Sequence, residues 1–279
     1  MRLAANQANI TALQLRLYAD YGNPSQLPAM FHREDGLKRL DVHIVDESLV
    51  TLLLDNIENI GRNLQFLSLY ASSETGNFEL SSIPIQNHSW KDQRRTFPLK
   101  ELRLTNWRLK NTYTSLSKII DFYRLLKLDL AKCMHSFEFL SAMTNAKPGM
   151  KFHLRHVGLN DFYREDAIEL PEDFRNVCLK KLFQACPDIS SLHIGANHLS
   201  PLPLALKEYL ASRGQELRLL SLVSEQKVLH ENEFDFVCKS CPNLEELSAS
   251  VHEEFFAAGM SLMNLVEFLV SCLTATRSS

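Results

Sequence analysis

Cysteine and histidine are the residues of this chain whose types and spacing could do chemistry. Cys238 and Cys241 form a C-x-x-C pair, a spacing that can bind zinc or form a redox-active disulfide. A zinc site of this kind needs a second pair of ligands at metal spacing, and none follows in the sequence. His230 and His252 are each followed by glutamate, yet neither completes the H-E-x-x-H motif of zinc hydrolases. We therefore expect no metal site, and a structural role for the two cysteines.

The sequence also lacks the short motifs that position a nucleophile or a phosphate group. It contains no G-x-G-x-x-G, no P-loop, no G-x-S-x-G and no kinase signature. We therefore expect no catalytic residue and no cofactor, and predict that the chain is not an enzyme. A hydrolase or other enzyme assembled across distant parts of the chain is kept as the least favoured hypothesis.

Most apolar residues belong to a repeated pattern, L-x-x-L-x-L, which fixes where the other side chains must point. Its cores begin near residues 10, 37, 64, 99, 125, 154, 189, 217, 244 and 265. Successive cores start 21 to 35 residues apart, around the period of leucine-rich repeats. In a strand, the second and third apolar positions point inward, and the residue between them points outward. The pattern predicts an α/β leucine-rich-repeat solenoid, a horseshoe with parallel strands on its concave face and helices on its convex face.

The cores extend over nearly the whole chain, so we predict a single domain over 1–279 with about ten irregular repeats. Apolar residues at helical spacing predict return helices near 49–60, 116–123, 174–183, 204–210 and 234–238. Two longer spacings indicate insertions at 77–98 and 161–171 that protrude from the loop edges, with their role left open. Neither end carries a recognisable polar cap, so we expect the chain to be a piece of a longer architecture.

Two repeats carry a Cys-Pro pair three residues before their first apolar anchor. These pairs are Cys186-Pro187 and Cys241-Pro242. The cysteine is expected to be a small buried residue at a helix end, and the proline to stop that helix before the strand. The order "helix, Cys-Pro-x-Leu-x-x-Leu" resembles the cysteine-containing leucine-rich repeats of fungal-type F-box proteins.

In that family the F-box binds an adaptor of a cullin ubiquitin ligase, and the repeats hold the protein to be ubiquitinated. The resemblance therefore implies a protein–protein interaction module, the substrate-recognition part of an F-box/LRR-type ubiquitin-ligase subunit. No F-box is visible in the sequence, so a cullin-ligase adaptor is an expected partner only if an F-box exists upstream. The alternative is a stand-alone repeat scaffold or inhibitor with no ubiquitin link.

The outward strand positions of the N-terminal half mix charged and aromatic residues, a composition typical of interaction hot spots. The candidate partner-binding residues are Arg39, Asp41, His43, Phe66, Tyr70, Glu101, Arg103, Lys127 and Asp129. The outward positions of the C-terminal half are smaller and polar, and we interpret His156, Ser191 and His193 there as part of a solvated face. Replacing Phe66, Tyr70 and Arg103 together is expected to abolish capture of a protein partner without unfolding the chain.

Composition and charge restrict the class of partner and the cellular compartment that we expect. The net charge of −3 and the pI near 6.4 give no electrostatic reason to expect binding to nucleic acid or to an anionic membrane. No apolar run reaches the ~18–20 residues of a membrane helix, and the start shows no signal peptide. Six cysteines spread over the whole chain do not form a dense disulfide framework. We expect a cytoplasmic or nuclear protein with reduced thiols.

Overall fold

The computed structural model describes residues 11–17, 37–45, 63–72, 96–160, 171–198, 201–227 and 229–250. The core predicted near residue 265 lies outside these ranges. So do the helix predicted at 49–60 and nearly all of the insertions at 77–98 and 161–171.

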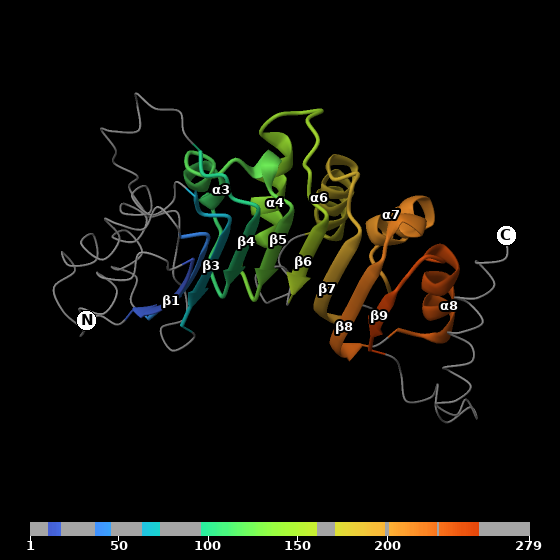
Figure 1. Ribbon diagram of the computed structural model, residues 1–279. Coiled ribbons are helices and arrows are strands. Elements are labelled where there is room, and N and C mark those ends of the chain that lie inside the picture. Colours follow the sequence, from blue (N-terminus) through green and yellow to red (C-terminus); the bar gives the residue numbers. More distant parts are fainter. Residues whose placement is uncertain are drawn as a thin grey trace.

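One nine-stranded parallel sheet runs through the described part of the chain, and its strands lie side by side in chain order (Figure 1). The strands are β1 (Ala12–Leu17), β2 (Arg39–Ile44), β3 (Phe66–Ala71), β4 (Glu101–Thr105), β5 (Lys127–Ala131), β6 (His156–Asn160), β7 (Ser191–His198), β8 (Leu219–Lys227) and β9 (Glu246–Ala249). Each strand therefore pairs only with strands next to it in sequence, an arrangement compatible with a solenoid.

The strand register places the apolar residues of successive cores in continuous rows. One inward row consists of Leu13, Leu40, Leu67, Leu102, Leu128, Val157, Leu192, Leu220 and Leu247. The next consists of Leu15, Val42, Leu69, Leu104, Leu130, Leu159, Ile194, Leu222 and Ala249. From β2 to β8 every member of both rows is buried, and each contributes roughly 1.5–3 kcal/mol of transfer free energy.

Helices cover the inward side of the sheet, and none of the described helices lies on the other side (Figure 1). They are α3 (Thr112–Leu116), α4 (Ser136–Asn145), α6 (Glu172–Ala185), α7 (Leu204–Arg213) and α8 (Glu231–Ser240), with 3-10 turns η5 (Phe122–Arg124) and η6 (Gly214–Glu216). Successive helices pack against one another, as successive strands do. The side of the sheet that faces away from the helices is called the open face below.

The predicted helices near 174–183, 204–210 and 234–238 are confirmed as parts of α6, α7 and α8. The prediction of a helix over 116–123 is wrong, because α3 ends at Leu116 and the chain continues through Ile120 into η5. Helix α4 was not predicted, since Phe137 and Phe139 alternate as in a strand. Both rings are buried against the sheet together with Leu140 and Met143, which gives α4 an unusually wide apolar face.

The two Cys-Pro pairs lie where the sequence predicts them. Cys186 follows α6 and donates its backbone N–H to Leu182, while Cys241 follows α8 and donates to Val237. Both side chains are buried, and burial is the main cause that raises the pKa of each thiol to about 12. The cysteines are therefore packing groups at helix ends, and each proline follows directly where the helix stops.

The loops that leave β4 and β5 are tied to the preceding strand by buried side chains. Trp107 donates its indole N–H to the Leu69 carbonyl at 2.9 Å, and the Cys133 thiol donates to the Leu104 carbonyl at 3.3 Å. Both side chains are almost fully buried. Residues of different types thus occupy the same position in two consecutive repeats, and each donates a hydrogen bond to a carbonyl of the preceding strand.

Candidate functional site

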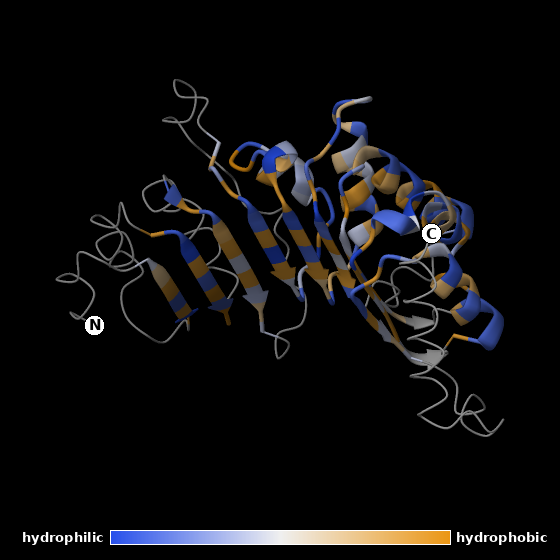
Figure 2. Cartoon of the chain, turned by 45° about the vertical axis from the view of Figure 1, so that its right-hand side comes forward, coloured by the Kyte–Doolittle hydropathy of each residue, from blue (hydrophilic) through white to orange (hydrophobic). Residues whose placement is uncertain are grey.

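The open face carries the residues that could contact a partner, because the opposite side of the sheet is filled by the apolar core. Figure 2 shows the alternation as bands of polar and apolar residues along the strands. Three outward rows cross the sheet. From β2 onward the first row consists of Arg39, Phe66, Glu101, Lys127, His156 and Ser191. The second consists of Asp41, Ser68, Arg103, Asp129, Gly158 and His193, and the third of His43, Tyr70, Thr105, Ala131 and Asn160. All the predicted partner-binding residues therefore lie on one surface.

A cation–aromatic pair joins β2 to β3 on this face. The Arg39 guanidinium lies 3.8 Å from the centre of the Phe66 ring and also forms an ion pair with Asp41 at 2.8 Å. Phe66 is only 9% exposed, and the Arg39 guanidinium lies over its ring. Phe66 therefore supports Arg39 from beneath, and the surface that a partner would meet here is the guanidinium.

His43 and Tyr70 form the next pair along the same two strands. Their rings meet edge to face with centroids 4.4 Å apart, and Tyr70 is 38% exposed. Burial, followed by the charge of Arg16, lowers the pKa of His43. Its Nε2 atom is buried without a hydrogen-bond partner in the described part of the chain. Tyr70 is thus the exposed aromatic group of this end of the face, held by a neutral imidazole.

Asp129 is the centre of a second cluster, which spans β4 to β6. It accepts a hydrogen bond from His156 Nε2 at 2.8 Å and forms ion pairs with Arg103 at 3.2 Å and Lys127 at 3.5 Å. Burial is the largest influence on this carboxyl and would raise its pKa. The hydrogen bond from His156 and the charges around it outweigh burial and lower the pKa of Asp129 to about 2. Asp129 is therefore a carboxylate over the whole physiological pH range.

The cluster continues onto β7, beyond the residues that sequence reasoning selected. His156 Nδ1 lies 2.7 Å from Ser191 Oγ, so Ser191, His156 and Asp129 form one hydrogen-bonded chain across three strands. His193 lies next to this chain, and burial, the largest cause, lowers its pKa. The sequence alone indicates a solvated face for these residues. Their places in the outward rows next to Lys127 and Asp129 are the signal that connects them to the cluster.

A depression of about 380 Å³ lies over this cluster. Its lining includes Arg103, Thr105, Lys127, Asp129, Ala131, His156, Gly158, Asn160, His193 and Leu219. Gly158 has no side chain, and a Cβ atom there would collide with the Asp129 carboxylate. A Cβ atom at Gly195 would collide with the amide oxygen of Asn160 in the same way. The two glycines therefore allow neighbouring polar side chains to lie low over the sheet, which hollows the face.

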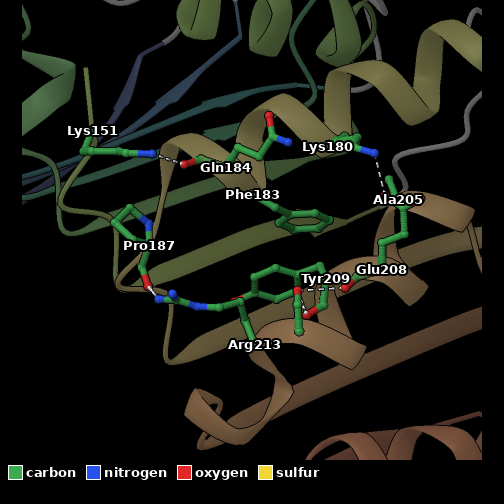
Figure 3. Close-up of a pocket in the computed structure, with 10 residues that line it drawn as sticks. Lys151, Lys180, Phe183, Gln184, Pro187, Ala205, Glu208, Tyr209 and Arg213 are labelled. Atoms are coloured by element: carbon green, nitrogen blue, oxygen red, sulfur yellow. Dashed lines mark hydrogen bonds and ion pairs between the residues drawn. The ribbon is translucent and has the colours of Figure 1, made fainter. Parts of the chain in front are cut away.

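A second hollow, of about 290 Å³, lies on the helix side between α6 and α7 (Figure 3). Phe183 and Tyr209 stack at its base with centroids 4.3 Å apart, and burial raises the pKa of Tyr209 well above its usual range. At its rim, Lys151 donates to the Gln184 carbonyl at 2.7 Å and Arg213 to the Pro187 carbonyl at 2.6 Å. Both cations bind carbonyls at the end of α6, which is a structural role.

The C-x-x-C pair is buried at the C-terminal end of α8. Cys238 and Cys241 are both buried and form no disulfide with each other. The described residues contain no group of three or more histidine, cysteine and acidic side chains that could hold a metal ion.

Among the described helices, none has the length and apolar content needed to cross a bilayer. A comparison of the chain with family models and curated proteins gave no match.

Proposed function

We propose that the chain is a leucine-rich-repeat solenoid that binds a protein partner on the open face of its sheet, without catalysing a reaction on that partner. The repeated cores and the parallel strands in chain order support the solenoid. In such a horseshoe the open face is the concave one, since the helices occupy the other side.

The observation that carries this proposal is the concentration of large and charged side chains on β2 to β5. Arg39, Tyr70 and Arg103 project from neighbouring strands, and a buried ring or an ion pair orients each of the two arginines. Arginine and tyrosine are the residue types enriched in interface hot spots, because they combine contact area with directed hydrogen bonds. Oriented side chains also lose less conformational entropy when a partner binds.

Two features favour a role in ubiquitination as the more specific form of this proposal. The Cys-Pro pairs resemble those of F-box proteins with leucine-rich repeats, and their buried cysteines at helix ends fit that pattern. The repeats would then hold the protein to be ubiquitinated. The competing form is a stand-alone scaffold or inhibitor, and co-purification with a cullin-ligase adaptor in source cells separates the two.

The test replaces the exposed hot-spot side chains and leaves Phe66 in place, because truncating a buried ring would create a cavity. The variant is Arg39→Ala, Tyr70→Ala and Arg103→Ala combined. The control combines Lys180→Ala, Glu208→Ala and Lys239→Ala, which removes ion pairs on the helix side. Cross-linked partners from source cells are quantified for wild type and both variants.

The open-face variant should capture at least tenfold less of the proteins that both wild type and control capture. Its circular dichroism spectrum should stay unchanged. Equal capture by all three proteins would overturn the proposed binding surface. Loss of capture with the helix-side control alone would move the interface to the convex side.

A further inference from the structure

Ser191, His156 and Asp129 form a hydrogen-bonded chain, of which the binding role uses only Asp129, through its ion pair with Arg103. The Oγ atom of Ser191 lies 2.7 Å from His156 Nδ1, and His156 Nε2 lies 2.8 Å from Asp129 Oδ1. The three residues are separated by 35 and 27 positions in sequence, so no local motif announces them. Parallel pairing of β5, β6 and β7 brings them together.

The hydrogen bonds assign the protons for a neutral His156 imidazole, the form that can act as a base. Asp129 is ionised and can only accept, so His156 Nε2 must carry the proton of their shared bond. In the neutral imidazole, Nδ1 is then the acceptor, and the Ser191 hydroxyl donates to it. A serine bonded to the free nitrogen of a histidine that a carboxylate orients is the arrangement of an activated nucleophile.

We propose that Ser191 is a nucleophile that forms a covalent ester with activated acyl or phosphonyl groups, with His156 as its general base and Asp129 as the positioning residue. This activity goes beyond partner binding. The substrate class is a small carboxylic ester. Its acyl carbon would meet the half-buried Ser191 next to His156, and the depression of about 380 Å³ that His156 and Asp129 line would receive the rest of the molecule.

The reaction follows from the proton positions. Ser191 Oγ adds to the acyl carbon while its proton passes to His156 Nδ1, and the ester C–O bond then breaks as that proton is given to the leaving alcohol. Water attacks the acyl-Ser191 ester by the same route, which releases the acid and restores the hydroxyl. With a fluorophosphonate the Oγ–P bond forms, the P–F bond breaks, and fluoride leaves.

The negative charge that develops on the substrate oxygen must be met by side chains. The backbone N–H of Ser191 already donates to the Arg155 carbonyl at 2.9 Å. Lys127 lies next to His156 in the outward row, and His193 lies two residues along β7 from Ser191, about 7 Å away on the same face. A missing backbone donor costs about 10²–10³ in rate, so we expect slow acylation and covalent capture more than rapid turnover.

The test is a fluorophosphonate probe on the full chain, with the modified residue mapped by mass spectrometry. Wild type should carry the adduct on Ser191, and Ser191→Ala should lose it. His156→Asn and Asp129→Asn should slow labelling at least tenfold, because a general base contributes about 10²–10⁴. Ser68→Ala, which removes another outward serine of the sheet, should label as wild type does.

Two readouts keep the test decisive even where a variant unfolds. In wild type alone, the adduct must lie on Ser191 and not on the outward serines Ser68 or Ser248. Long-range ¹H–¹⁵N spectra should show the His156 proton on Nε2 in wild type, and a shift toward Nδ1 in Asp129→Asn. Absence of an adduct, an adduct on another serine, or labelling of Ser191 that persists in His156→Asn would each overturn the proposal.

Discussion

His156 donates from Nε2 to Oδ1 of Asp129 across 2.8 Å, and this bond joins two halves of the open face that the sequence separates. On one side of it lie the cations of β4 and β5, and on the other lie the small polar residues of β6 and β7. The surface is therefore one polar network between β4 and β7.

The Asp129 carboxylate is expected to contribute stability at neutral pH that is lost in acid. Its pKa falls from 3.8 to about 2 on folding, so the contribution is fully present above pH 4 and disappears as pH falls toward 2. Allowing for solvent screening, the shift corresponds to about 1–2 kcal/mol. Urea unfolding between pH 2 and 5 measures it.

Asp129→Asn should flatten this part of the pH profile. Asp235→Asn is the control, because that carboxylate pairs with Lys239 on the surface of α8. If the free energy of unfolding depended on pH with the same slope in wild type and in Asp129→Asn, the lowered pKa of Asp129 would be contradicted.

Gly158→Ala should break the bond between Asp129 and His156. A methyl group at this position collides with the Asp129 carboxylate, which must move, at an expected cost of about 1–3 kcal/mol. The measurement is thermal unfolding together with NMR of the His156 ring. Gly195→Ala is the matched comparison, because its new methyl group meets Asn160 and leaves His156 undisturbed. The same ring spectrum in both variants would argue against this geometry.

The described cysteines should be inert in the folded protein. Cys133, Cys178, Cys186, Cys238 and Cys241 are buried and form no disulfide, and burial is the main cause that raises the pKa of Cys241 to about 12. At neutral pH the thiolate of Cys241 is then only about 10⁻⁵ of the total, and an aromatic disulfide reagent should react at the rate of unfolding. Stoichiometric zinc by elemental analysis, lost in Cys238→Ser, would instead restore the metal interpretation.

Trp107→Phe should destabilise the fold by about 1–3 kcal/mol. The substitution removes the buried indole N–H that donates to the Leu69 carbonyl and leaves a small void. Tyr70→Phe changes an exposed ring on the open face and should have little effect on stability. Chemical denaturation of both variants makes the comparison, and similar midpoints would show that the indole bond is unimportant.

The sequence predicted the strands well because leucine spacing and strand geometry share one period. Each described strand begins two residues after the start of a core, as with Leu37 and Arg39 or Leu217 and Leu219. Helices were harder, since helix propensity competes with the tight turns between strands. The apolar residues Ile119 and Ile120 fit a helix but are buried in a turn, and Phe137 and Phe139 alternate yet belong to α4.

For the open face, the sequence predicted which residues point outward but not which side chains touch one another. Outward positions follow from alternation, which correctly placed Arg39, Arg103 and Asp129 on one face. Which side chains touch depends on register and rotamer, and these follow from packing over the whole sheet. The cover that Arg39 provides to Phe66, and the reach of Ser191 to His156, could not be read from spacing alone.

The order of the strands in the sheet, which follows the sequence, has a mechanical consequence. Since β1 to β9 each bond only to strands adjacent in sequence, no long-range pairing locks one end of the sheet to the other. A pulling force applied across the described part would load one strand pair at a time, and extension would proceed in steps of about one repeat. The same locality lets folding begin at any pair of neighbouring repeats and spread from there.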